Sequence, residues 1–307
     1  MIKSYGKIFI ALVLLFVSGC DTRYGDRCLE TVQKITAENQ LTPYVFQTKK
    51  HKIFALLGPQ RQAMTAKKEP MDVHVYIEGD GLAWASRFHI SLDPTPVEPT
   101  GLTLAMADQT SAAKVYLGRP GHYIEDNRLG LYSWTFARFS TETIETYDDI
   151  IDQLHQLYPK AQISLFGYSG GALVALLTAA KRSQEGKHDI VRVVTFAGVL
   201  DHEAWSECHD SSPLTFSLNS LAYLEPLREI PQCHYSGLKD TIVPLKVSKS
   251  YMRYFQGNPN IQLVQVPNVD HWHGWEKFWS RESLTLKDGS CLENATSSGA
   301  QAKASKN

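Results

Sequence analysis

One serine in this sequence lies between glycines where one apolar run gives way to another. The stretch GYSGG at 167–171 has the spacing G-x-S-x-G around Ser169, with ISLF before it and ALVALLTAA after it. A serine hydroxyl is a weak nucleophile near neutral pH, so it needs a neighbouring base to take its proton. Glycines on both sides would allow a tight, strained turn that exposes this hydroxyl. We therefore interpret Ser169 as a candidate nucleophile.

The segments around Ser169 predict strands that alternate with helices. The strand-like runs are rich in Val, Ile, Phe and Tyr and end in Gly, Pro or Asp, and helical patterns lie between them. Such alternation predicts an α/β fold with a mostly parallel central sheet and helices on both faces. The expected strands are 51–58, 72–79, 113–120, 163–168, 191–198, 233–240 and 261–267, and the expected helices are 101–110, 141–158, 170–182, 246–256 and 272–280.

A serine on a tight turn from a strand into a helix resembles the nucleophile elbow of the α/β-hydrolase superfamily. The resemblance covers about 50–285. It implies the α/β-hydrolase fold and a catalytic set in which the serine is followed along the chain by an acid and then by a histidine. The stretch 201–231 interrupts the strand and helix pattern, and we expect a small cap insertion there.

The resemblance selects partners for Ser169. Asp240 lies in GLKDTIVP, which is similar to the family's G-x-x-D-x-x-V-P turn, and we prefer it to Asp201 as the acid. The pair Asp270-His271 is similar to the family's usual pair at the start of the last helix, so His271 is preferred to His273 as the base. His271 would accept the serine proton, and Asp240 would orient the imidazole.

The resemblance also implies an oxyanion hole made of two backbone N–H groups. One belongs to Gly170, and the other to Asp80 in the loop after strand 72–79, with Gly81 as the alternative. The loop departs from the family pattern because Glu78 stands where a histidine is usual. Asp80 also brings a carboxylate close to the developing negative charge.

The Asp80 carboxylate must therefore turn away or pair with a cation, and Arg87 and Arg119 are candidate partners. Other side chains are candidates for the pocket or for a charged substrate group, although packing or surface roles are equally open to them. The aromatic candidates are Trp84, Tyr123 and Trp134, and the polar ones are His122 and Arg138, for which we favour a surface role.

The N-terminus MIKSYGKIFIALVLLFVSGC has two lysines, an apolar run at 8–17 and small residues before Cys20. This is the pattern of a secretory signal, and its ending resembles the bacterial lipobox, in which the cysteine is lipidated. We expect a signal peptide at 1–19 and a lipid anchor on Cys20, with the mature chain in the cell envelope facing the periplasm. Asp21 favours the inner membrane, and the outer membrane is the alternative.

The rest of the chain divides into a tether and N-terminal segment at 20–49, a hydrolase domain at 50–290 and a disordered tail at 291–307. Besides Cys20 the sequence has four cysteines, an even number that predicts disulfides in an oxidising compartment. We expect Cys208 to pair with Cys233 and Cys28 with Cys291, and free thiols are the alternative.

Composition narrows the function further. The net charge is −1, so no basic excess suggests a nucleic-acid partner. No phosphate-binding glycine motif or zinc spacing occurs, and His271 and His273 lack a third ligand at useful spacing, so we expect no cofactor and no metal. The sequence predicts a serine hydrolase that cleaves an ester, thioester or related acyl bond of a small molecule. The alternatives are a peptidase with the same triad or a non-catalytic binding lipoprotein.

Overall fold

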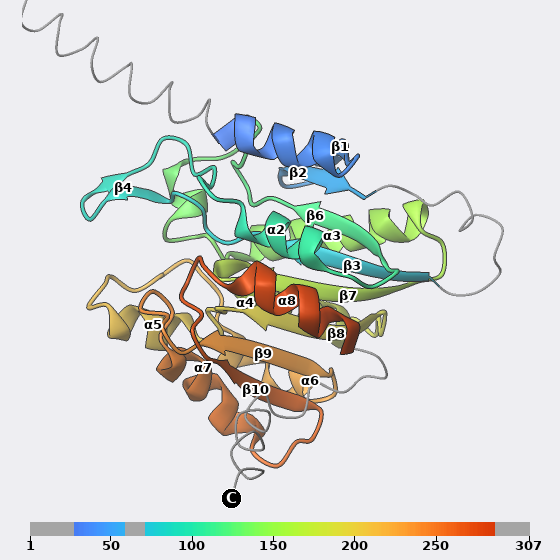
Figure 1. The fold of residues 1–307 in the computed structure, drawn as a ribbon. Helices are drawn as coiled ribbons and strands as arrows, with labels where there is room; N and C mark the ends of the chain where they lie inside the picture. The colour runs from blue at the N-terminus through green and yellow to red at the C-terminus, as the bar shows by residue number, and fades with distance from the viewer. Residues whose placement is uncertain (1–27, 59–70, 286–307) are drawn as a thin grey trace, which may run out of the picture.

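The computed structural model describes residues 28–58 and 71–285, which form a central sheet flanked by helices (Figure 1). The strands of this sheet are β1 (Thr42–Gln47), β2 (Lys52–Leu57), β3 (Met71–Ile77), β6 (Ala113–Leu117), β7 (Ala161–Tyr168), β8 (Ile190–Phe196), β9 (Gln232–Gly237) and β10 (Ile261–Val266). Their order is β1-β2-β6-β3-β7-β8-β9-β10, and all strands from β6 to β10 in this order run parallel. The predicted α/β fold with a mostly parallel sheet is therefore confirmed.

Helices cover both faces of the sheet, as predicted. They are a helix at 28–38, α2 (Thr100–Ala107), α3 (Thr141–Leu157), α4 (Gly170–Gln184), α5 (His202–Cys208), α6 (Leu224–Arg228), α7 (Leu245–Met252) and α8 (Trp275–Glu282). Side chains alternate between the faces of a strand. Val75 of β3 therefore packs in the same cluster as α3 and α4, whereas Tyr76 packs against α2 and α8, which lie in front of the sheet in Figure 1.

Two features depart from the expected pattern, and a third concerns the stretch 201–231, where a small cap insertion is predicted. β1 pairs antiparallel with β2, so the sheet begins inside the segment that the sequence analysis assigned to the N-terminal tether. A small hairpin of β4 (Trp84–Ser86) and β5 (His89–Ile90) projects from the loop after β3 (Figure 1). The stretch 201–231 holds α5 and α6, and α6 packs on α4. No helix in the described ranges combines the length and apolar character of a bilayer-spanning segment.

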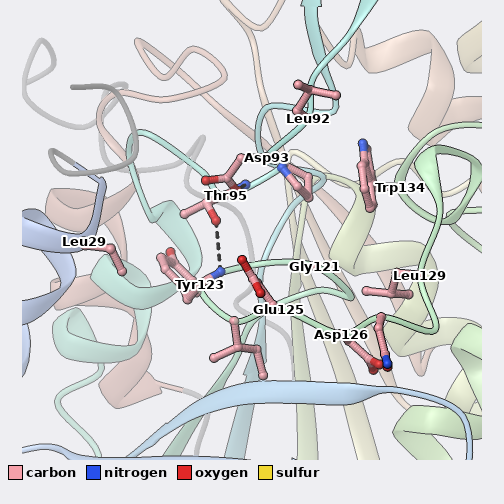
Figure 2. A pocket seen from close by; sticks show the side chains of 13 residues that line it. Leu29, Leu92, Asp93, Thr95, Gly121, Tyr123, Glu125, Asp126, Leu129 and Trp134 are labelled. Carbon is pink, nitrogen blue, oxygen red and sulfur yellow. Dashed lines mark hydrogen bonds between the residues drawn. The ribbon is translucent and has the colours of Figure 1, made fainter. Parts of the chain in front are cut away.

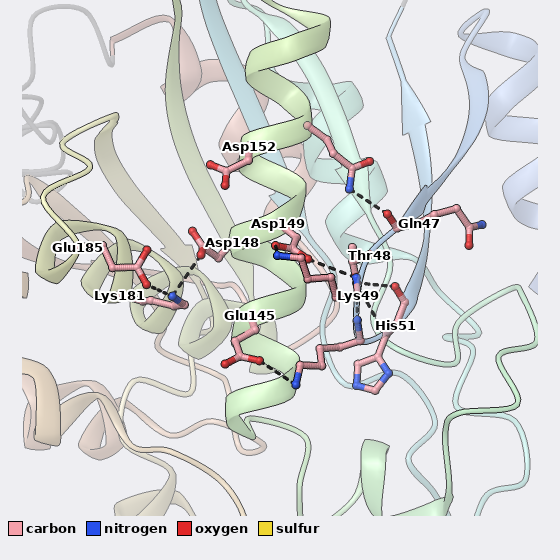
Figure 3. A network of polar contacts seen from close by, with 12 residues as sticks. Gln47, Thr48, Lys49, His51, Glu145, Asp148, Asp149, Asp152, Lys181 and Glu185 are labelled. Atoms are coloured by element: carbon pink, nitrogen blue, oxygen red, sulfur yellow. Dashed lines mark hydrogen bonds and ion pairs between the residues drawn. The ribbon is translucent and has the colours of Figure 1, made fainter.

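A network of charges holds α3 against α4. The Arg182 side chain of α4 is almost fully buried and donates to the carboxylates of Asp148, Asp152 and Asp189. Lys181 pairs with Asp148 at 3.2 Å. Figure 3 shows this pair and, on the other side of α3, the pair that Glu145 makes with a lysine of the β1–β2 turn. Ion pairs on two sides of α3 thus connect it to α4 and to the β1–β2 turn.

We expect Arg182→Met to lower the free energy of unfolding by about 3–5 kcal/mol, because it removes the buried guanidinium that binds all three of these carboxylates. Urea unfolding followed by circular dichroism measures the change. The matched control is Lys34→Met, since Lys34 and Glu38 form an exposed pair at 3.9 Å. This control should cost less than about 1 kcal/mol. Equal effects of the two substitutions would contradict the assigned role of Arg182.

Candidate active site

Ser169 lies on the turn between β7 and α4 with φ 51° and ψ −119°. This is a conformation that side-chain-bearing residues rarely adopt, and it costs on the order of 1–3 kcal/mol. The glycines around it are required by space. A Cβ at Gly167 would lie 2.4 Å from Cα of Ala172, and one at Gly171 would lie 2.3 Å from the carbonyl oxygen of Ile77. The G-x-S-x-G spacing therefore meets a steric demand, as the sequence analysis inferred.

His271 and Asp240 form a buried pair. Nδ1 of His271 lies 2.9 Å from Oδ2 of Asp240. The other carboxylate oxygen accepts the backbone N–H groups of Ile242 and Val243, each at 2.8 Å. An ionised carboxylate only accepts hydrogen bonds, so Nδ1 of His271 carries the proton and Nε2 is left to act as a base.

The rival residues have other roles. Asp201 caps the start of α5 and also accepts from Asn219 at 2.9 Å and from Ser250 at 2.7 Å. His273 pairs with Asp270 at 3.1 Å, and its side chain is largely exposed. The structure thus brings Asp240 rather than Asp201 to the preferred histidine.

Ser169 and His271 line the same cavity, which has a volume of about 780 Å³. The hydrogen bonds of the described residues join His271 to Asp240 and include none from the Ser169 hydroxyl. In serine hydrolases without substrate, the contact between serine and histidine is often long. Tyr168, the residue before the serine, donates its hydroxyl to the carbonyl of His271 at 2.8 Å. This link was missed in the sequence, because Tyr168 stands at the unspecified position of the motif.

The Asp80 carboxylate is neutralised by two arginines. Arg119 Nη1 lies 3.0 Å from Oδ1, and Arg138 Nη1 lies 2.6 Å from Oδ2. Burial opposes the charge, but the two guanidinium groups outweigh it and lower the pKa of Asp80 below its usual value. Arg119 was an expected partner, whereas Arg87 instead lies over the Phe88 ring.

This carboxylate packs directly on the first turn of α4. A Cβ at Gly170 would lie 2.0 Å from Oδ1 of Asp80, so only glycine fits there. A Cβ at Gly79 would lie 3.2 Å from that of Ser169. The loop of Gly79 and Asp80 therefore lies against both the serine and Gly170, which is where the second backbone donor was expected.

Glu78 holds the same loop in place through hydrogen bonds of its buried carboxylate. Its carboxylate is buried and accepts the N–H of Gly79 at 2.9 Å, the N–H of Gly101 at 3.0 Å and the hydroxyl of Tyr116 at 3.1 Å. Gly101 belongs to the first turn of α2, where helix N–H groups favour negative charge. Burial nevertheless raises the pKa of Glu78 to about 7. Glu78 thus joins the loop to α2 and β6.

The walls of the cavity are mostly apolar, and they come from the segments that follow β3, β8, β9 and β10, including β4 and α5. The apolar lining residues are Leu82, Ala83, Trp84, Pro96, Val97, Val199, Trp205, Ile242, Val243 and Trp272. Trp84 is therefore placed in the pocket for which it was a candidate. Among the described residues, no three His, Cys, Asp or Glu side chains are arranged to hold a metal ion.

Tyr123 and Trp134 line a different hollow, of about 450 Å³, which is shown in Figure 2. Its other walls include Leu29 and Leu92. The surface role favoured for His122 and Arg138 is wrong, because both side chains are buried next to the Asp80 loop.

The predicted pairing of Cys208 with Cys233 is wrong. Cys208 keeps a free thiol and packs at the cluster of Val199, Val243 and Val247, whereas Cys233 is in a disulfide and faces the cluster of α2 and α8. Cys28 is a buried thiol. Cys291 and Cys20 lie outside the described residues, as do the predicted signal peptide and tail.

Comparison with known proteins adds a family to this geometry. The model of the family described as "Serine hydrolase (FSH1)" matches residues 85–272. This chain belongs to that family. No curated protein sequence matches the chain significantly.

Solved structures agree on the fold. An α/β serine hydrolase homologue from Coxiella burnetii is 14% identical, with a TM-score of 0.52, over 80% of this chain and 96% of that chain. The esterase Pf2001 from Pyrococcus furiosus is 16% identical, with a TM-score of 0.56, over 83% of this chain and 92% of that chain. Est1E from Butyrivibrio proteoclasticus is 12% identical, with a TM-score of 0.51, over 78% and 95%.

The raised pKa of Glu78 predicts a pH dependence of stability. Between its ordinary value of 4.5 and about 7, the folded state binds more protons at Glu78 than the unfolded state does. The free energy of unfolding of the wild type relative to Glu78→Gln should therefore fall as pH rises through this window, and stay level outside it. Urea unfolding of both proteins at several pH values tests this. A constant difference from pH 4.5 to 7.5 would contradict the assigned protonation.

Proposed function

We propose that this serine hydrolase cleaves acyl esters or thioesters through Ser169, His271 and Asp240. The observation that carries the proposal is the buried His271–Asp240 hydrogen bond in the same cavity as a serine held in a strained elbow. Such a pair fixes the imidazole tautomer, so that Nε2 is free to take a proton from the serine.

The proposed reaction has two halves. His271 takes the Ser169 proton while the serine oxygen attacks the acyl carbon, and it then gives that proton to the leaving alcohol or thiol. Water next gives a proton to the same imidazole and attacks the acyl carbon. The imidazole returns that proton to the Ser169 oxygen as the acyl–serine bond breaks and the acid leaves. In both halves the backbone N–H groups of Gly170 and Asp80 would hold the developing oxyanion.

The two arginines solve the electrostatic problem that Asp80 raises. An unpaired carboxylate beside Gly170 would repel an oxyanion that forms within a few ångströms of it. Arg119 and Arg138 compensate its charge and also hold the side chain, so that the Asp80 N–H remains available as a donor. We propose that the cluster of Asp80, Arg119 and Arg138 positions the loop after β3, in which Glu78 stands where the family usually has a histidine.

The cavity favours a large apolar acyl or aromatic group. Its wall carries three tryptophans, Trp84, Trp205 and Trp272, and several aliphatic side chains. Burying apolar area in such a pocket contributes roughly 25 cal/mol per Å² before the costs of binding are counted. We propose a small-molecule ester with such an acyl group, presented at the cell envelope to a chain anchored through Cys20.

A fluorescent fluorophosphonate tests the triad directly, because it reacts only with an activated serine. We expect the full chain to be labelled, Ser169→Ala to lose all labelling, and Asp240→Asn to label about 10⁴-fold more slowly. His271→Ala should also lose labelling.

Two controls match these variants in residue type. His273→Ala and Asp201→Asn change the rival residues and should label at rates close to that of the wild type, provided that circular dichroism shows them folded. Labelling that survives Ser169→Ala, or that is lost with His273→Ala alone, would refute the proposed triad.

Loss of one arginine should expose the charge of Asp80. We expect Arg138→Met to lower kcat for a soluble aryl ester by about 10²-fold or more, with a smaller change in KM, since the effect falls on the developing oxyanion. Adding Asp80→Asn, which keeps the backbone N–H, should restore part of kcat. A double variant no faster than Arg138→Met would show that the arginine acts through packing instead.

A further inference from the structure

Several large apolar side chains are exposed on the segments that follow strands β3, β6, β8 and β10. We define the apolar rim as Phe88, Leu92, Tyr132, Phe216 and Trp272. Phe88 is 81% exposed and Leu92 is 73% exposed. Folded proteins rarely expose several such side chains together unless the surface has a partner.

Three residues of the rim, Tyr132, Phe216 and Trp272, connect to the cavity. The Phe216 ring contacts that of Tyr132, with centroids 6.2 Å apart, and Tyr132 contacts Phe136 at 5.8 Å. Phe136 in turn contacts Trp84, also at 5.8 Å, and Trp84 lines the cavity. Trp272 belongs to both the rim and the cavity wall. An apolar path thus leads from the outer surface to the neighbourhood of Ser169.

The described chain begins beside this rim. Leu29, in the first helix, and Leu92 line the same hollow (Figure 2). Ahead of Leu29 the sequence carries the apolar run 8–17 and Cys20. Eight residue steps separate Cys20 from Cys28, and they span at most about 28 Å. A chain held in a membrane at Cys20 therefore keeps Cys28 within about 28 Å of the lipid, and Leu92 of the rim shares a hollow with the next residue, Leu29.

The charges of the hairpin also suit a lipid surface. Residues 84–90 contain Arg87 and His89 and no acidic residue. The Arg87 guanidinium lies 5.6 Å from the centre of the Phe88 ring at the hairpin tip. A basic side chain is attracted to an anionic bilayer surface, and the exposed Phe88 beside it adds apolar area.

We propose that the apolar rim docks on the surface of a lipid bilayer, so that the mouth of the cavity faces the lipid. If the rim docks in this way, the substrate is an amphipathic ester drawn from the membrane rather than from solution. This consequence rests on the proposed function. The docking itself rests on the rim, the charge of the hairpin and the place where the chain begins.

The test uses the full chain in vesicles of phosphatidylethanolamine and phosphatidylglycerol. Phe88→Cys, in a Cys208→Ser background, carries an environment-sensitive fluorophore. We expect its emission to shift to the blue on vesicles and to be quenched by lipids with brominated acyl chains. The control is Leu157→Cys. Leu157 is exposed and ends α3 just before β7 begins, at the end of the strands that lies away from the cavity. This label should stay in water.

Two results would overturn the proposal. The label at 88 could behave like the one at 157, or it could be shielded equally without vesicles, which would mean that protein covers the rim. The measurement is repeated with Ser169→Ala, so that docking is scored without turnover. Docking with no fluorophosphonate reactivity in the wild type would refute the proposed function alone, and reactivity without docking would refute the rim alone.

A second measurement follows the substrate. The double variant Phe88→Ser, Leu92→Ser changes no residue that lines the catalytic cavity. We expect it to hydrolyse a long-chain ester embedded in vesicles about tenfold more slowly, since it loses much of the apolar area of the rim. Its rate on a soluble short-chain ester should stay within about twofold of the wild type. Equal losses on both substrates would contradict docking.

Discussion

Helix α4 approaches the end of β3 so closely that their backbones are in direct contact. The backbone of Gly171 lies against the carbonyl groups of Ile77 and Glu78, with no room for a Cβ. This contact places the first turn of the helix directly beside the loop after β3. The exposed serine, the N–H of Gly170 and the loop of Asp80 are all brought together by it, so a single pair of packed backbones determines most of the site.

The sequence predicted the parts of the molecule that depend on local pattern. Buried parallel strands are continuous apolar runs, and six of the seven expected runs lie next to one another in the sheet's parallel part, with 51–58 forming β2. β1 was missed, because an edge strand that is mostly exposed and contains a proline has the same sequence pattern as a polar tether. The hairpin of β4 and β5 is too short to leave a periodic signal.

Among the site residues, too, those in short motifs were predicted, and those that are brought together only by the fold were not. Ser169, Asp240 and His271 each sit in a short motif, and the structure brings His271 to Asp240 as expected. Arg138 lies 58 positions from Asp80, and no motif joins them. Their pairing follows from topology, because β6 lies beside β3 and the loops after both strands meet at one edge. The prediction that Cys208 pairs with Cys233 was wrong for a similar reason, because an even number of cysteines does not indicate where each thiol lies in the fold.

The hydrogen bond from Tyr168 to the carbonyl of His271 has a mechanical consequence. It connects the residue that precedes the serine to the loop after the last strand, and Trp275 donates to the same carbonyl at 3.1 Å. These hydrogen bonds connect the end of β7 to the loop after β10, at the point where proton transfer would occur. We therefore expect Ser169 and the His271 loop to lose their relative positions in one step rather than one after the other. The alignment of serine and histidine would persist on heating until the part of the sheet from β7 to β10 comes apart, and it would disappear together with the core.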